Sequence, residues 1–229
     1  MKSNPSVKIL IFDLDGTLVD SSSQILNALN EACSEADCGL ISKELFATLL
    51  GLPINTIIAH LDLDSASQLK LINSFRTKLK NSINESNTLY EGVEDFLVLS
   101  KALGFHLAIA TSKPTYLAEL VVANSPLSNY IDFIQGTEGF PAKPAPDVIL
   151  RCLNHFNTKN GIMFGDRVED IMSAVAVGIP SIGIAQGHHL IEDLIVAGAK
   201  LGFKNFLEAF REAEQIWSLL TNLNRAIKN

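Results

Sequence analysis

The sequence predicts an α/β protein, a Rossmann-like doubly wound parallel sheet with an inserted all-helical cap domain. Two observations predict this class. Apolar runs of strand length alternate with segments of helical periodicity, which is typical of a parallel sheet with helices on both faces. One long stretch after the first of these strands shows helical periodicity alone. We therefore expect a core domain from residues 1–20 and 88–229 and a cap domain from residues 21–87.

The first expected strand, residues 7–12, runs directly into Asp13, Leu14, Asp15 and Gly16. In open α/β sheets, ligands bind at the carboxyl ends of the strands. Asp13 and Asp15 would point the same way on a regular strand, and two crowded carboxylates repel unless a cation or a shared proton relieves them. The pair predicts a divalent-metal site. Taken alone, it is equally compatible with a polar loop after a strand.

Residues 21–87 are expected to be helical throughout, because apolar residues recur there at helical spacing. The serines at 21–23 offer N-caps for the first helix. Breaks at Gly51, Leu52 and Pro53 and at residues 62–65 divide the stretch into separate helices.

Beyond residue 88 the pattern changes to alternating elements. We predict helices over residues 92–103, 116–123, 147–156 and 171–177, and strands over residues 105–111, 131–134, 162–164 and 179–184. Residues 205–226 are predicted to form an amphipathic helix that packs on the core.

Composition excludes several classes of protein. The net charge of −7, from 25 acidic and 18 basic residues, argues against a nucleic-acid surface. The longest apolar runs fall well short of the roughly 20 residues that cross a bilayer. The three cysteines show no metal-ligand spacing, and residues 1–6 do not resemble a secretory signal. We expect a cytoplasmic protein.

Polar residues follow the strands at what should be one edge of the sheet: Asp13 and Asp15, Thr111 and Ser112, Lys143, and Asp166 with Asp170. Two sources of carboxylates suit Mg²⁺, which prefers oxygen ligands. A hydroxyl, backbone amides and a lysine beside such a cation suit a phosphate group. In such a site Asp13 can attack phosphorus as a nucleophile, and Asp15 can hand a proton to the leaving oxygen.

With these motifs in order, the chain resembles the haloacid dehalogenase superfamily phosphatases, and most closely the phosphoglycolate-phosphatase-like branch. The family's first motif, Asp-x-Asp-Gly-Thr, is met at residues 13–17, and its second, a strand ending in Thr or Ser, at Thr111 and Ser112. The third, Lys-Pro-x-Pro, is met at residues 143–146, and the fourth, Gly-Asp-x-x-x-Asp, at residues 165–170. The helical stretch between the first two motifs is similar to the family's helical cap of the C1 type.

The resemblance implies a role for each residue. Asp13 corresponds to a nucleophile that forms an aspartyl-phosphate, and Asp15 to the general acid/base whose backbone carbonyl also binds Mg²⁺. Thr111 and the Ser112 amide would hold the phosphoryl group, and Lys143 would bridge Asp13 and the phosphate. The remaining implied residues form the metal site and its support: Asp166 as a direct Mg²⁺ ligand, Asp170 as the group that orients Lys143 or a metal-bound water, Gly16 for the tight turn, and Thr17 for the loop.

Several other residues are open to two interpretations. Gly51 to Pro53 fall where related caps carry a substrate-contacting loop, and they also read as a plain helix break. Arg76 and Lys80 lie one turn apart on a cap helix; they could meet a second anionic group of the substrate, although we favour a solvated helix face. His188 and His189 could border the mouth of the site, although exposed loop histidines are the simpler interpretation.

We therefore expect Mg²⁺-dependent hydrolysis of a small phosphorylated metabolite, with phosphoglycolate as the leading candidate, by a monomer or homodimer that binds neither nucleic acid nor membrane. A phosphomutase similar to β-phosphoglucomutase is an alternative, although such enzymes usually carry Glu-Asp where this chain has Gly165 and Asp166. Dehalogenase relatives lack an acid/base carboxylate equivalent to Asp15. A non-catalytic regulatory relative is the third alternative, which the filled motif positions do not support.

Overall fold

The computed structural model describes residues 7–49, 51–83, 88–186 and 189–226 of the 229-residue chain. His188, for which a place at the mouth of the site was considered, lies outside the described residues, as do Gly187 and Leu50. Within the described part, no helix combines the length and the apolar character needed to cross a membrane.

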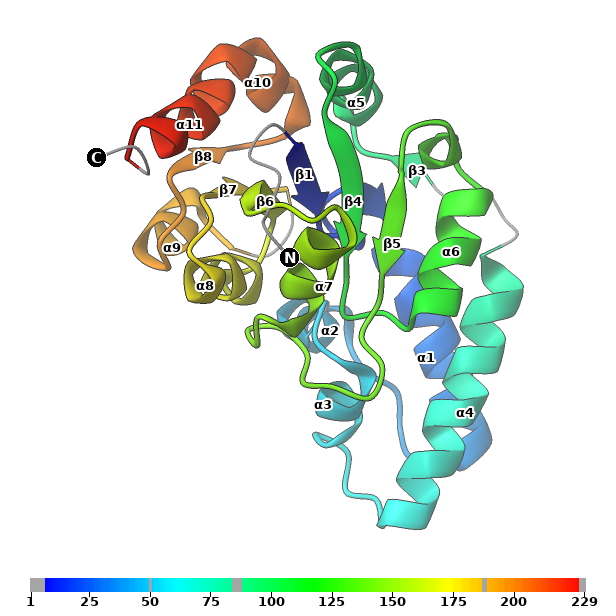
Figure 1. The fold of residues 1–229 in the computed structure, drawn as a ribbon. Helices are drawn as coiled ribbons and strands as arrows, with labels where there is room; N and C mark the ends of the chain where they lie inside the picture. Colours follow the sequence, from blue (N-terminus) through cyan, green and yellow to red (C-terminus); the bar gives the residue numbers. More distant parts are fainter. Residues whose placement is uncertain (1–6, 50, 84–87, 187–188, 227–229) are drawn as a thin grey trace.

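The core is a parallel sheet in the order β5-β4-β1-β6-β7-β8, which confirms the predicted fold class (Figure 1). The chain builds outward from β1 on one side through β4 and β5, then returns to the other side of β1 through β6, β7 and β8. The strands are β1 (Lys8–Phe12), β4 (His106–Ala110), β5 (Phe133–Gln135), β6 (Asn160–Gly165), β7 (Ser181–Ile184) and β8 (Leu201–Phe203). A switch in strand order beside β1 marks the place where ligands bind in such sheets.

After Lys8 at its start, strand β1 is apolar and buried, because helices cover both faces of the sheet. Leu10 and Phe12 join one core cluster, in which Phe12 stacks on Phe164 with ring centroids 4.9 Å apart. Ile9 and Ile11 join the cluster on the opposite face. The helices of the core are α5 (Val93–Ala102), α6 (Thr115–Ala123), α7 (Asp147–His155), α8 (Val168–Val177), α9 (Ile191–Val196), α10 (Phe206–Arg211) and α11 (Ala213–Ala226), with a short 3-10 turn at Pro126–Asn129.

The predicted helical stretch is found between two short strands, β2 (Val19–Asp20) and β3 (Thr88–Leu89), which pair antiparallel. It contains α1 (Ser22–Ala36), α2 (Lys43–Leu49), α3 (Ile54–Ile58) and α4 (Ser65–Ser82). We call these four helices, with the segments that connect them, the helical insertion. They lie beyond the end of the sheet toward which the strands point, with α1 and α4 side by side (Figure 1). The domain boundaries at residues 20 and 88 remain a prediction.

The structure corrects several predicted elements. Residues 205–226 form two helices, α10 and α11, instead of one. The strand expected at 131–134 lies at Phe133–Gln135, because it pairs from Ala108 onward with β4. Helix α9 and strand β8 were not predicted; they are six and three residues long, too short for periodicity to indicate.

Candidate active site

The site lies where β1, β4 and β6 end, because their register brings the residues after each strand together. Phe12 pairs with Ile109 on one side and with Phe164 on the other. Asp13 therefore lies between the end of β4, followed by Thr111, and the end of β6, followed by Asp166. A cavity of about 880 Å³ opens above these ends and is lined on its far side by the helical insertion.

Asp13, Lys143 and Asp170 form a buried chain of charges. The Lys143 ammonium donates to Asp13 Oδ1 at 2.6 Å, to Asp170 Oδ1 at 2.5 Å and to the Ala110 carbonyl at 3.0 Å. The other oxygen of Asp170 accepts from the backbone N–H of Arg167 at 3.1 Å. Both oxygens of Asp170 are thus held in place. By contrast, Asp13 Oδ2 accepts no hydrogen bond from any residue that the structure describes.

Asp166 is held by the residues after the first carboxylate pair. The Thr17 hydroxyl donates to Asp166 Oδ1 at 2.7 Å, so Thr17 supports a carboxylate of the fourth motif. Gly16 has a φ of +88°, and a Cβ there would lie 2.7 Å from Asp166 Oδ2. A side chain at position 16 would be strained and would displace Asp166.

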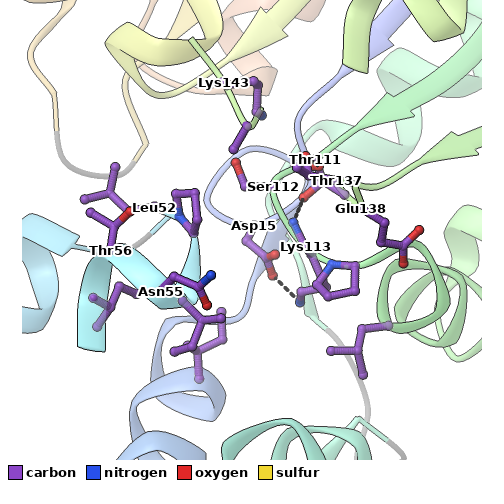
Figure 2. Close-up of a pocket in the computed structure, with 18 of the residues that line it drawn as sticks. Asp15, Leu52, Asn55, Thr56, Thr111, Ser112, Lys113, Thr137, Glu138 and Lys143 are labelled. Carbon is purple, nitrogen blue, oxygen red and sulfur yellow. Dashed lines mark hydrogen bonds and ion pairs between the residues drawn. The ribbon is translucent and has the colours of Figure 1, made fainter. Parts of the chain in front are cut away.

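The Asp15 carboxylate does not join the other three carboxylates and is held by a different set of hydrogen bonds. Its Oδ1 accepts from the Lys113 ammonium at 2.8 Å (Figure 2). The same oxygen accepts from the Ser21 hydroxyl at 2.5 Å. Neither partner was predicted to belong to the site. Ser21 was predicted as a helix cap, but it makes no side-chain cap bond because its hydroxyl turns to Asp15. The lysine directly after Thr111 and Ser112 was a signal that could have indicated Lys113.

Thr111 and Ser112 lie on the loop after β4 and line the cavity. Thr111 is buried, and its hydroxyl oxygen accepts from the Lys113 backbone N–H at 3.2 Å. Figure 2 shows Thr111 and Ser112 on the core side of the cavity, with Leu52, Asn55 and Thr56 facing them from the helical insertion.

Asp13, Asp166 and Asp170 could together hold a cation, because each offers a carboxylate oxygen and these oxygens all lie within 4.8 Å of one another. Burial raises the pKa of Asp13 to about 7, and although Lys143 opposes the shift, Asp170 and Asp15 add to it. Burial, with the charges of Asp13 and Asp170, also raises the pKa of Asp166 well above its ordinary value. More negative charge is gathered here than Lys143 alone offsets, and carboxylate oxygens are the ligands that a hard cation prefers.

Lys143 itself stays charged. Burial lowers the pKa of its ammonium, but the carboxylates of Asp13 and Asp170 outweigh burial, so the net shift is upward. An ammonium held between two carboxylates in a buried site is positioned to steady further negative charge beside Asp13.

The helical insertion touches the core at Gly51. Its φ is +85°, and a Cβ there would lie 2.5 Å from Arg167 Cδ, so the close approach needs glycine. Leu52, which follows it, lines the cavity. Arg167 is buried after β6 and donates from Nε to Glu169 Oε2 at 3.2 Å.

The predicted site residues divide into two groups. Asp13, Asp15, Thr111, Ser112, Lys143 and Gly51 all line the cavity, whereas Gly16, Thr17, Asp166 and Asp170 support it from behind. Arg76 also lines the cavity, but Lys80, one turn further along α4, is exposed. His189 lies 4.0 Å from Asp193 and does not line the cavity.

Comparisons with known proteins agree with the motifs. A family model described as haloacid dehalogenase-like hydrolase matches residues 10–184. The phosphoglycolate phosphatase of Colwellia psychrerythraea is 26% identical over 88% of this chain and 94% of its own, and that of Haemophilus influenzae strain 86-028NP is 29% identical over 81% and 89%. The crystal structure of a predicted phosphatase from Clostridium acetobutylicum superposes with a TM-score of 0.81 at 29% identity, covering 91% of this chain and 99% of the other. The predicted resemblance and the prediction of an enzyme are confirmed.

Proposed function

This chain belongs to the haloacid dehalogenase-like hydrolase family, and we propose that it is a phosphatase that hydrolyses a small phosphate monoester through an aspartyl-phosphate on Asp13. One observation carries the proposal: Asp13 is held at Oδ1 by Lys143, while Oδ2 accepts no bond from the described residues and the side chain lines the cavity. A carboxylate fixed at one oxygen and open at the other is suited to nucleophilic attack.

The reaction would proceed in two displacements. Asp13 Oδ2 attacks phosphorus, the bond from phosphorus to the ester oxygen breaks, and Asp15 donates a proton to the departing alcohol. Asp15 then accepts a proton from water, whose oxygen attacks phosphorus and releases inorganic phosphate from Asp13. Throughout, Lys143 and the hydroxyl and amide groups of Thr111 and Ser112 hold the phosphoryl oxygens.

Asp15 is positioned for the proton transfers because Ser21 and Lys113 fix one of its oxygens at the cavity's edge. It lines the same cavity as Asp13 but belongs to a separate set of hydrogen bonds. Two carboxylates held apart in this way can take different roles in one reaction.

The residues present fit Mg²⁺. We propose that the side chains of Asp13 and Asp166 and the backbone carbonyl of Asp15 hold it, with Asp170 nearby, because the carboxylates of Asp13, Asp166 and Asp170 converge in a buried site. When bound, Mg²⁺ offsets the charge of these carboxylates and of the phosphoryl oxygens. The helical insertion would act as a cap that excludes bulk water from this site.

The phosphomutase alternative gains no support. Gly165 cannot carry a larger side chain without rearrangement, because a Cβ there would clash with Asp170 Cβ. Phosphoglycolate is the leading candidate substrate, because the similar proteins from Colwellia psychrerythraea and Haemophilus influenzae are named phosphoglycolate phosphatases.

The test is a panel of phosphate monoesters incubated with purified protein in Mg²⁺ or in EDTA, with inorganic phosphate as the measured product. We expect release in Mg²⁺ and its loss in EDTA. Failure to release phosphate from any ester would remove the basis of the proposal, and isomerised sugar phosphates without release would support a mutase.

The intermediate can be tested separately with an Asp15→Asn variant. With p-nitrophenyl phosphate the first step should still proceed, because its leaving group needs no acid. The second step should be slow, because the variant lacks the general base that activates water. The aspartyl-phosphate should therefore accumulate. Mass spectrometry after an acid quench should find one phosphoryl group on the peptide that contains Asp13. An unmodified peptide after confirmed release of p-nitrophenol would argue for direct attack by water.

A further inference from the structure

The charged side chains that line the cavity from the core all have partners in the described structure. Because these charges are paired within the protein, they leave little net charge to attract the part of a ligand that lies far from Asp13. The pairs are Lys143 with Asp13 and Asp170, Lys113 with Asp15, Glu169 with Arg167, and Glu138 with the backbone N–H and hydroxyl of Thr115.

Arg76 is the exception. It projects from α4 of the helical insertion and lines the cavity, but no carboxylate of the described chain lies within ion-pair distance of it. Its Nε is fully buried and has no hydrogen-bond partner among the residues described. A guanidinium stays charged in proteins, and a buried N–H without an acceptor is costly. The solvated helix face favoured from the sequence is therefore wrong for Arg76, whereas the exposed Lys80 fits it.

Most of the side chains that line the cavity from the helical insertion are apolar. The cavity is lined beside it on α4 by Phe75 and Leu79, and from α1 and α3 by Ile25 and Ile57. Low polarity strengthens the attraction between a cation and an anionic ligand group, and the planar guanidinium matches the oxygens of a carboxylate or phosphate.

We propose that Arg76 is a specificity-determining residue that binds a second anionic group, a carboxylate or a phosphate, on the leaving group of the substrate. The inference rests on the proposed phosphatase reaction and deepens it. The phosphoryl group undergoing transfer lies against Asp13, Thr111 and Lys143, and the rest of the substrate extends past Asp15 toward the helical insertion. Apolar side chains contact its carbon skeleton, and its distal anion supplies the acceptor that Arg76 Nε lacks.

The experiment compares substrates that differ only in the distal charge. Suitable pairs are phosphoglycolate with hydroxyethyl phosphate, phosphogluconate with glucitol phosphate, and fructose bisphosphate with fructose monophosphate. The first two pairs test a near and a distant carboxylate, and the third tests a second phosphate. Kinetics are measured for the wild type and for Arg76→Met, Arg76→Lys and the control Lys80→Met, which removes a cation one turn away on the exposed face.

In at least one pair the wild type should prefer the member that carries the distal carboxylate or phosphate. Arg76→Met should raise KM for that member by about 10- to 100-fold, the loss expected for a hydrogen bond between charged groups. KM for the member without a distal charge should change by less than about threefold, which would show that the variant folds and turns over. Arg76→Lys should recover part of the preference, and Lys80→Met should retain all of it.

Two results would overturn the inference while leaving the phosphatase intact: a wild type that shows no preference in any pair, or an Arg76→Met variant that slows both members of a pair equally. Binding gives an independent measure. Calorimetry with the Asp13→Asn variant, which cannot turn over, should show a ratio of affinities between pair members that falls when Arg76→Met is added. If no ester were hydrolysed, the proposed function would fail, and this ratio would still decide the role of Arg76.

Discussion

The two sides of the cavity differ in how their charges are paired. On the core side, Lys143 is locked between Asp13 and Asp170, and Lys113 is locked to Asp15. On the side of the helical insertion the lining is mainly apolar, and Arg76 has no partner in the described chain. This difference indicates separate roles for the two sides. The core holds the reacting groups in fixed positions, and the helical insertion offers the Arg76 guanidinium to an anionic group of the substrate.

The largest effect should come from Asp13→Asn, which tests the core side. Removing the nucleophile should lower kcat by more than about 10⁴-fold, because no other group can form the covalent intermediate. The substitution is nearly isosteric, so circular dichroism should be unchanged. Retained phosphate release would exclude Asp13 as the nucleophile.

Lys143→Met tests whether the buried pairing holds the core side together. It leaves Asp13 and Asp170 buried without their cation, so the free energy of unfolding should fall by about 3–5 kcal/mol. The control is Lys101→Met, which breaks an exposed pair with Asp132 and should cost at most about 1 kcal/mol. Urea denaturation of both variants in EDTA measures the difference, and equal losses would contradict a structural role for the buried chain.

The pH dependence of stability should carry the signature of Asp13. The pKa of this carboxyl is about 7 in the folded state and near its ordinary value of 3.8 in the unfolded state. Between these two pH values the folded state holds a proton on Asp13 that the unfolded state has released. Its contribution to stability is therefore present below about pH 4 and is lost as pH rises toward 7. The amide of the Asp13→Asn variant does not titrate, so Tm of the variant minus Tm of the wild type should increase between pH 5 and pH 8 in EDTA.

Differential scanning fluorimetry measures both melting temperatures. Mg²⁺ binds the ionised carboxylates, so adding it at pH 8 should raise Tm of the wild type more than that of the variant. A Tm difference that does not change with pH would show that Asp13 is not titrating in this range.

Gly51→Ala tests the contact between the two sides and should have the smallest effect. The new methyl group would meet Arg167 and displace the loop that carries Leu52, raising KM by about 5- to 30-fold if the displacement costs about 1–2 kcal/mol. Gly39→Ala is a matched control, since Gly39 has a φ of +82° and nothing within 4 Å of its Cβ position. Both variants carry the same backbone strain, so equal KM values would rule out a role for the contact.

Prediction from the sequence succeeded where the signal was local. Asp13 and Thr111 were each predicted at a strand end because an apolar run stops there, and the shared edge follows from parallel strands. Prediction failed for short elements, such as β8, and for the division of residues 205–226 into two helices, because tertiary packing decides both. The crowding of Asp13 and Asp15 indicated a metal site, but the carboxylates that converge on that of Asp13 are those of Asp166 and Asp170. The carboxylate of Asp15 is not part of this group.

The sequence by itself determined the fold class, the family and the residues at the end of each core strand, because spacing along the chain encodes them. Only the tertiary structure decided which charges are paired: that Lys113 and Ser21 hold Asp15, that Lys143 joins Asp13 to Asp170, and that Arg76 is left without a partner among the residues described. The physical reason is that pairing and burial depend on groups far apart in the chain. Charge on a helix face looks the same in sequence whether that face meets water, as at Lys80, or a cavity, as at Arg76.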